Sequence, residues 1–293
     1  MTAQAKKLAV LTSRVRLEER LLLAELRRRD IDFEQVDTRR FLVRLDNGQP
    51  LRLPYSGALS REISHTRNLY ACRLLEHAGV PVVNSSRIIG LCGDKLLTTL
   101  ALRDGGLPTI PALAGMTPDA VLDELDGFGY PAVVKPLTGS WGRLAARMHD
   151  HEQAEALLEH RAALSGPQHQ ITFVQQYVDK PDRDIKAYVF GGEVVGAIYK
   201  VRHDHWRTNT ARGGRAEVCP LTDDLVKVLR STADAIGEGV LGVDVIEDRD
   251  GRLHVNEVNH TPEFHGAIDV LDVDLVGAYV DYVMSRLEPE DGR

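Results

Sequence analysis

The chain has 293 residues, of which 43% are hydrophobic and 27% are charged, and this balance excludes a collagen-like, coiled-coil or wholly disordered protein. Its 36 Lys and Arg against 43 Asp and Glu residues give a net charge of −7, so we expect no nucleic-acid partner. No apolar run approaches the roughly 18 residues of a membrane span, and the first residues lack the apolar core of a signal peptide. We therefore expect a cytoplasmic protein with no membrane partner.

The first 92 residues alternate between strand and helix patterns. Short apolar runs predict strands at 8–11, 31–36 and 80–83, and helical spacing predicts helices at 17–30 and 62–78. Alternation across 42–53 around Asp46-Asn47-Gly48 predicts a hairpin. The β-α-β order is typical of an open α/β layer.

The pattern of predicted elements changes after residue 92. Hairpin turns now connect most of the predicted strands, which favours antiparallel sheets. A helix is predicted at 94–103, at the start of this part. Further helices are predicted at 118–126, 151–164, 223–236 and 274–286, and strands at 131–135, 144–148, 172–178, 185–190, 194–201, 240–247 and 253–259. The fold class is therefore α/β followed by α+β.

Acidic and amide side chains cluster on the last two predicted strands. If residues 248–251 form the turn between them, Asp244 lies opposite Val255 and diagonal to Glu257. Residues two apart share a sheet face, so Asp244, Glu257 and Asn259 point the same way. Three hard oxygen ligands suit Mg²⁺ together with phosphate oxygens. The alternative is the solvated polar face of an ordinary hairpin.

Two lysines and a glycine-containing loop are candidates for binding phosphate. Lys135 ends an apolar strand, and Lys95 opens a helix after Gly93-Asp94. The loop Gly139-Ser140-Trp141-Gly142-Arg143 joins two predicted strands, and its glycines allow backbone amides to turn toward phosphate oxygens. Surface lysines and a plain hairpin loop would look the same.

Two further segments carry chemistry. Arg212, within Asn209-Thr210-Ala211-Arg212-Gly213-Gly214, could stabilise charge on a transferring phosphoryl or acyl group, although a flexible basic loop is the alternative. The segment Gln175-Gln176-Tyr177-Val178 could offer backbone groups to an adenine, although any strand exit would look the same.

Taken in order, these motifs resemble the ATP-grasp ligases over almost the whole chain. The resemblance is closest to the branch that contains the ribosomal-protein glutamate ligase and the LysX-type ligase of lysine biosynthesis. It implies an N-terminal pre-ATP-grasp domain over 1–92 and two α+β subdomains, 93–178 and 179–293, that clasp ATP. Lys186 stands where the family usually has Arg, and Gln176 where Glu is usual.

The resemblance also implies a role for each matching residue. The nucleotide would be held by Lys95, Lys135, the loop Gly139, Ser140, Trp141, Gly142 and Arg143, the segment Gln175, Gln176, Tyr177 and Val178, and by Asp179 and Asn209. Two Mg²⁺ ions would be held by Asp244, Glu257 and Asn259. Catalysis would involve Arg212 and Lys186. The amino-acid pocket would be lined by Lys200, Thr210, Ala211, Glu263, Phe264, His265, Gly266 and Ala267.

The implied function is ATP-dependent ligation through an acyl phosphate. The α-amino group of an α-aminoadipate-like or glutamate-like amino acid would be joined to the C-terminal glutamate side chain of a small acidic carrier protein, in lysine- or arginine-type biosynthesis. An acidic carrier needs a basic docking surface, for which the candidates are Arg14, Arg16, Arg39, Arg40, Arg61 and Arg67. The alternative for these residues is an ordinary solvated arginine surface. The enzyme would be a homo-oligomer, a dimer or tetramer. The alternatives are a ligase that adds glutamate to a protein C-terminus and a non-catalytic ATP-binding module.

Overall fold

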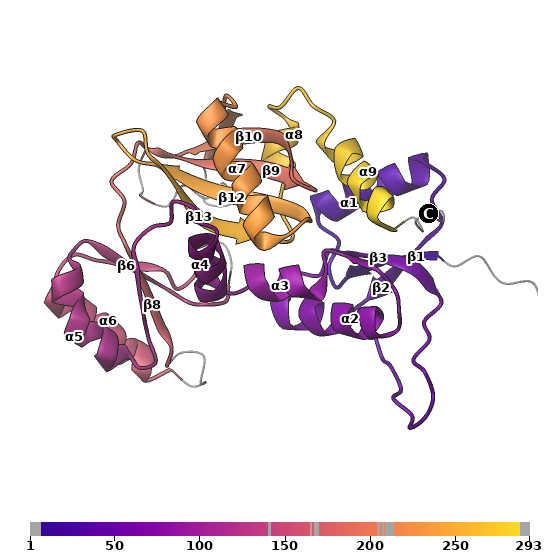
Figure 1. Ribbon diagram of the computed structural model, residues 1–293, viewed down its shortest axis with the longest axis horizontal. Helices are drawn as coiled ribbons and strands as arrows, with labels where there is room; N and C mark the ends of the chain where they lie inside the picture. The colour runs from indigo at the N-terminus through magenta and orange to yellow at the C-terminus, as the bar shows by residue number, and fades with distance from the viewer. Residues whose placement is uncertain are drawn as a thin grey trace, which may run out of the picture.

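The computed structural model describes residues 7–139, 142–164, 166, 170–203, 206, 208 and 214–287. Three sheets follow one another along the chain, and Figure 1 shows them as separate layers joined by α4 (Lys95–Asp104) and by the strand connections. Their strands lie within residues 7–83, 112–176 and 183–259. Among the described residues, no helix is both long and apolar enough to cross a membrane.

The first sheet is parallel, in the order β2-β1-β3-β4. Its strands are β1 (Lys7–Thr12), β2 (Phe33–Asp37), β3 (Tyr55–Ser60) and β4 (Val82–Val83), and its helices are α1 (Leu17–Arg28), α2 (His65–His77) and α3 (Ser86–Cys92). β1 is buried almost throughout, as expected for a parallel strand covered on both faces. The open α/β layer predicted from the sequence is therefore confirmed.

The last helix, α9 (Leu275–Leu287), returns to the first sheet. Figure 1 shows it beside α1, and its buried residues Val280, Val283 and Leu287 join a core cluster with Leu8 and Leu22. The C-terminal end of the described chain thus covers one face of the N-terminal sheet, while α2 packs on the opposite face.

The second sheet is antiparallel, in the order β5-β8-β6-β7. Its strands are β5 (Ala112–Gly115), β6 (Ala132–Lys135), β7 (Ala146–Met148) and β8 (Thr172–Gln176), covered on one face by α5 (Pro118–Phe128) and α6 (His151–Ala162). Thr117 and Asp150 cap these helices by accepting hydrogen bonds from backbone N–H groups of the first turn.

The third sheet is also antiparallel, in the order β11-β10-β9-β12-β13. It contains β9 (Arg183–Phe190), β10 (Glu193–Val201), β11 (Arg215–Val218), β12 (Val240–Glu247) and β13 (Leu253–Asn259), with α7 (Asp223–Ile236) and the short α8 (His265–Ile268). The prediction of antiparallel sheets after residue 93 is confirmed.

The hairpin predicted over 42–53 is wrong, because those residues, all described, form a loop with a turn at Asn47-Gly48. Leu42 and Leu45 are exposed, whereas Leu53 is half-buried against the core beside the first sheet, so the segment packs on that core without pairing into a hairpin. Sequence reasoning also missed β3, β5, β11, α3 and α8. In β3, the small Gly57 lies against Leu287 of α9, a contact that no local pattern signals.

The predicted register of the last hairpin is wrong for two reasons: the turn is one residue longer than predicted, and β13 contains a bulge. Glu247 pairs with Leu253, so the turn contains five residues, and the register shifts again between Asp244 and Val245. Asp244 therefore lies directly opposite Glu257 instead of Val255. Two residues of β13, Asn256 and Glu257, are accommodated where regular pairing would place one.

Candidate active site

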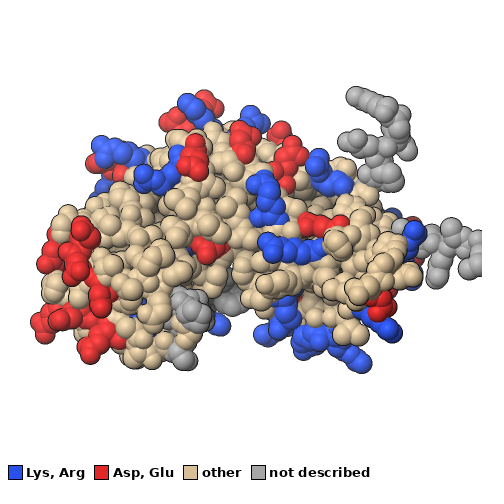
Figure 2. All heavy atoms as spheres, turned by 60° about the horizontal axis from the view of Figure 1, so that its bottom comes forward, with Lys and Arg blue, Asp and Glu red and all other residues tan. Residues whose placement is uncertain are grey.

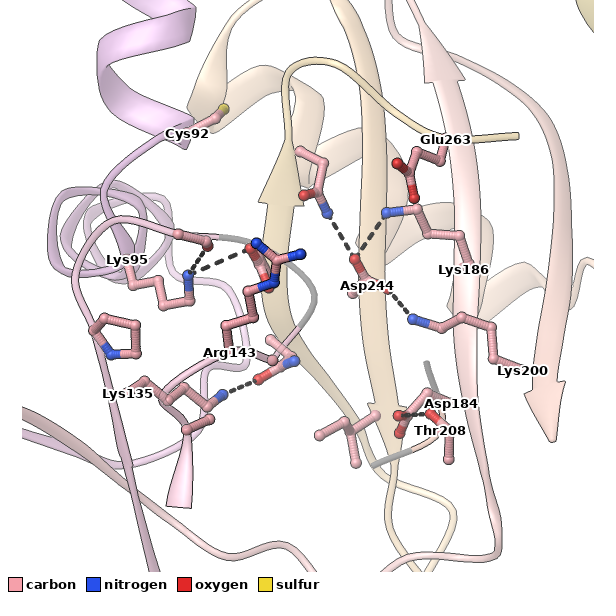
Figure 3. A pocket seen from close by; sticks show the side chains of 18 of the residues that line it. Cys92, Lys95, Lys135, Arg143, Asp184, Lys186, Lys200, Thr208, Asp244 and Glu263 are labelled. Atoms are coloured by element: carbon pink, nitrogen blue, oxygen red, sulfur yellow. Dashed lines mark hydrogen bonds and ion pairs between the residues drawn. The ribbon is translucent and has the colours of Figure 1, made fainter. Parts of the chain in front are cut away.

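A cavity of about 660 Å³ lies where the three sheets approach one another. It is lined from the first domain by Arg16 and His65, from the second by Lys135 and Gln175, and from the third sheet by many polar side chains. Figure 3 shows Lys95, Lys135 and Arg143 at one end, and Lys186, Lys200 and Glu263 at the other. We call these the lysine–glycine end and the Asp244 end.

At the lysine–glycine end, two lysines point into the cavity from different elements (Figure 3). Lys95 is the first residue of α4, whose N-cap Asp94 accepts hydrogen bonds from the N–H groups of Leu96 and Leu97. Its Nζ donates to the carbonyl of Gly139 at 2.9 Å and lies 3.5 Å from a carboxylate oxygen of Glu257. The helix start thus fixes where this ammonium group enters the cavity.

Lys135 ends β6 and donates to the side-chain oxygens of Gln175 at 2.6 Å and Asn256 at 2.8 Å. Burial lowers the pKa of Lys135 to about 8, and Lys95 adds to this shift, while Glu257 opposes it. The ammonium group is still mostly protonated at pH 7. The hydrogen-bond acceptors that it contacts among the described residues are neutral. A negatively charged ligand would stabilise its charged form.

The loop between β6 and β7 closes this end. Gly139 and Gly142 have φ values of +133° and +61°, conformations that favour glycine. Both residues and Arg143 line the cavity. Ser140 and Trp141 lie outside the described residues.

The strand exit after β8 also lines the cavity, through Gln175, Gln176, Tyr177 and Val178. The backbone N–H groups of Gln176 and Tyr177 already donate to the carbonyls of Pro111 and Pro131. Asp179 is exposed, pairs with Arg249 at 2.8 Å and is not among the lining residues. The structure therefore does not bring Asp179 to the cavity together with the four residues that precede it.

At the Asp244 end, charged side chains contact one another across three strands. Asp244 pairs in register with Lys186 on β9 and with Glu257 on β13. Its carboxylate accepts from Lys186 at 2.8 Å, from Lys200, and from the amide nitrogen of Asn259 at 2.7 Å. Burial acts to raise the pKa of Asp244, but the two lysines outweigh it and hold the pKa below its usual value.

The donors present fit Mg²⁺ by their chemistry, since ionised carboxylates and an amide oxygen are hard ligands. Among the described residues, no group of three or more His, Cys, Asp or Glu side chains could hold a metal ion by itself. Asp244, Glu257 and Asn259 offer such oxygens on the neighbouring strands β12 and β13.

The predicted amino-acid pocket is brought together only in part. Glu263, His265, Gly266 and Lys200 line the cavity. Phe264 and Ala267 are fully buried in the core cluster beside α9. Asn209, Thr210, Ala211 and Arg212 lie outside the described residues.

Sequence reasoning did not assign His65, Asn256 and His260 to the cavity that they line, and Arg16, predicted for the carrier surface, lines the cavity as well. Asn256 reaches Lys135 because of the bulge in β13, which alternation does not reveal. Burial, together with His65 and Arg61, lowers the pKa of His260 to about 3, so this imidazole is neutral at pH 7. Arg16 is at the N-cap of α1, and its spacing from Glu19 is the one sequence signal available.

Two family models match the chain and together cover most of it. The model described as the LysX preATP-grasp domain matches residues 8–91, and that described as the RimK-like ATP-grasp domain matches residues 100–283. The chain belongs to the RimK-like ATP-grasp family. The predicted resemblance, the ATP-grasp fold and an ATP-dependent ligase as the class of enzyme are confirmed.

Curated ATP-grasp relatives match over most of their length. The chain is 31% identical over 286 residues to the glutamate–LysW ligase ArgX of Sulfolobus acidocaldarius, covering 96% of this chain and 99% of the relative. It is 34% identical over 212 residues to the alpha-aminoadipate–LysW ligase LysX of Saccharolobus solfataricus, covering 72% and 77%. These relatives are named LysW ligases, in agreement with the predicted branch of the family.

A solved ATP-grasp structure supports the fold. The crystal structure of a RimK domain protein from Sphaerobacter thermophilus superposes with a TM-score of 0.77 at 24% identity, and covers 95% of this chain and 99% of that one. At this level of identity the likeness concerns the fold alone.

Proposed function

We propose that the protein is an ATP-dependent ligase that joins the α-amino group of glutamate, α-aminoadipate or a similar acidic amino acid to the C-terminal glutamate side chain of a small acidic carrier protein. The observation that carries this proposal is one cavity that combines lysines suited to phosphates with carboxylates suited to Mg²⁺. The two curated relatives are named for LysW but differ in their amino acid, which supports the carrier more strongly than the amino acid.

At the lysine–glycine end, Lys95 and Lys135 would bind the nucleotide phosphates, and the loop from Gly139 to Arg143 would cover them. The segment 175–178 would contact adenine. Since the N–H groups of Gln176 and Tyr177 are already used within the protein, that contact falls to other main-chain groups of the segment. Phosphoryl transfer requires mainly positioning and charge neutralisation, which these residues provide.

Bound Mg²⁺ would neutralise phosphate charge between Asp244, Glu257 and Asn259, and we propose two ions. The carrier carboxylate attacks the γ-phosphorus of ATP, ADP leaves, and an acyl phosphate is formed. Lys186 and Lys200, fixed on neighbouring strands by Asp244, would stabilise negative charge on the reacting carboxyl group. By family resemblance we propose the same role for Arg212.

The surface charge supports docking of an acidic carrier on the N-terminal domain. Figure 2 shows Lys and Arg gathered over the side of the face that holds the first sheet, and Asp and Glu gathered at the opposite side, where α5 and α6 lie. Exposed acids of α5 include Asp119, Asp123 and Glu124. Opposite charges steer association toward the basic side.

Not every arginine predicted for that surface can take part. Arg14, Arg39, Arg40 and Arg67 are exposed, so we propose them as docking residues. Arg61 is fully buried, so its assignment to a docking surface is wrong. Its hydrophobic and acidic partners lie inside the molecule and become apparent only in the tertiary structure.

The proposal is tested by intact-mass spectrometry of a LysW-type carrier incubated with enzyme, ATP, Mg²⁺ and a panel of amino acids. We expect one mass increment, equal to an acidic amino acid less water, and one ADP for each increment. Glutamate added repeatedly to an unrelated protein C-terminus would instead support the ribosomal-protein type of ligase. ATP binding without any carrier-dependent ADP would contradict the proposal.

A further inference from the structure

A line of alternating charges runs from the core of the N-terminal domain to the wall of the cavity. Arg61 donates from Nε to Glu19 Oε1 at 2.9 Å, and Arg16 contacts both oxygens of the same carboxylate, each at 3.0 Å. Arg16 Nη1 then donates to Glu263 Oε1 at 2.6 Å. These four side chains are defined here as the Arg61–Glu263 relay, which connects β3, α1 and the loop after β13.

Burial decreases along the relay. The side chains of Arg61 and Glu19 are fully buried, whereas 17% of Arg16 and 32% of Glu263 are exposed. Only Arg16 and Glu263 line the cavity. The two hydrogen bonds from Arg16 to Glu19 restrict the plane of the Arg16 guanidinium group. The buried residues therefore fix the orientation in which Arg16 contacts Glu263.

The backbone beside Glu263 is fixed as well. Arg61 Nη1 donates to the carbonyl of Pro262 at 3.2 Å, and the hydroxyl of the buried Tyr188 donates to the carbonyl of Glu263 at 3.1 Å. Arg61 thus acts on Glu263 in two ways. It orients the carboxylate through Glu19 and Arg16, and it fixes the neighbouring backbone through the carbonyl of Pro262.

Among the described residues, Glu263 has the most exposed of the carboxylates that line the cavity. Glu257 is 27% exposed and contacts Lys95. Asp184 is 17% exposed and contacts Lys180. Asp244 is 11% exposed and contacts Lys186. The carboxylate of Glu62 has no exposed surface. Figure 3 shows Glu263 on the Lys186 side of the cavity, away from Lys95 and Lys135.

Resting on the proposed function, we propose that Glu263 binds the ammonium group of the incoming amino acid and accepts one of its protons, and that Arg61, Glu19 and Arg16 are positioning residues for it. The nitrogen lone pair attacks the carbonyl carbon of the acyl phosphate, and a C–N bond forms. The C–O bond to phosphate breaks with its electron pair leaving on oxygen. Of the three ammonium protons, one passes to Glu263, one leaves with phosphate and one remains on the amide.

The test compares two acceptors of the same acyl phosphate. Hydroxylamine is neutral near pH 7 and traps the acyl phosphate as a hydroxamate without an ammonium site, whereas ligation of glutamate or α-aminoadipate requires one. In Glu263→Gln we expect the ratio of hydroxamate formation to ligation to rise at least tenfold. We also expect ligation by the variant to become steeper with pH than in the unmodified enzyme, because solution must remove the proton.

The relay is tested by Arg16→Gln and the conservative Arg16→Lys, with Arg28→Gln as the control. Arg28 lies on the same helix and pairs with Glu25 away from the cavity. We expect Arg16→Gln to raise both the KM for the amino acid and the ratio of hydroxamate formation to ligation. Arg16→Lys should restore part of both quantities, and Arg28→Gln should change neither. Combining Arg16→Gln with Glu263→Gln should add little, since both act through one carboxylate.

Equal loss of hydroxamate formation and ligation in Glu263→Gln would overturn the assignment, as would additive effects in the double variant. If the unmodified enzyme formed neither hydroxamate nor ligated carrier, the proposed function itself would be overturned, and the assignment with it. A ratio that rises in Glu263→Gln but stays unchanged in Arg16→Gln would overturn the relay alone.

Discussion

The two ends of the cavity differ in how their charges are matched. Among the described residues, the lysine–glycine end carries three cations, Lys95, Lys135 and Arg143, beside one carboxylate, Glu257. The Asp244 end carries Arg16, which pairs with Glu263, and Lys186 and Lys200, which both pair with Asp244. The first end therefore has an excess of positive charge, and we call the second end balanced because each of these three cations contacts a carboxylate.

This difference indicates which ligand each end suits. Excess positive charge in a partly buried site is costly until an anion arrives, so the lysine–glycine end suits a triphosphate. A balanced end is organised before a ligand binds, and suits a ligand with both charges, such as an amino acid. The boundary between them runs along β12 and β13, where Asp244 faces Glu257.

The largest effect is expected at that boundary. Glu257→Ala removes a proposed metal ligand and leaves the ammonium group of Lys95 without its carboxylate. We expect turnover to fall by at least about 100-fold with the fold intact. Turnover is measured by ADP release and folding by circular dichroism. The control is Glu247→Ala on the same hairpin, which loses the pair with Arg183. Near-normal turnover in Glu257→Ala would contradict the metal assignment.

A second experiment tests the excess charge itself. Lys135→Met removes a charged hydrogen-bond donor, so we expect the KM for ATP to rise about 10- to 100-fold, as the loss of one charged hydrogen bond implies. The matched control is Lys227→Met on the exposed face of α7. The KM for ATP is measured by steady-state kinetics at varied ATP concentration. A change confined to the KM for the amino acid would contradict our assignment of the two ends.

The pH dependence sharpens the same point. Burial, helped by Lys95, lowers the pKa of Lys135 to about 8, so its charge is present below that pH and lost above it. We expect the KM for ATP to be constant below pH 8 and to rise above it, by at most about tenfold per unit. In Lys135→Arg the charge persists, so this rise should disappear. A flat profile in the unmodified enzyme would show that Lys135 does not govern nucleotide binding.

The smallest effect is expected from adding a methyl group at Gly242, which lies beside Lys186 at the Asp244 end. A Cβ atom at Gly242 would lie 2.7 Å from Pro262 and 3.0 Å from Lys186 Nζ. We expect Gly242→Ala to lower the free energy of unfolding by about 1–3 kcal/mol and to raise the amino-acid KM more than the ATP KM. Denaturant unfolding and kinetics measure this. Gly127→Ala, in a helix with nothing near its Cβ, is the control and should be neutral or stabilising.

The sequence by itself determined most elements and the family. The positions of β6, β12 and α7 followed from apolar periodicity and helix caps, because these signals are local. The lysines at the end of β6 and the start of α4, and the oxygen-bearing residues of β12 and β13, were found for the same reason.

The tertiary structure alone decided which of those residues meet. The bulge that places Asp244 opposite Glu257, and Asn256 against Lys135, depends on pairing between strands and leaves no mark in either strand's alternation. The same holds for Arg61, whose buried partners come from α1 and from the loop after β13, far apart in the chain. Burial and charge pairing are properties of residues that folding brings together, so they could not be obtained from local sequence patterns.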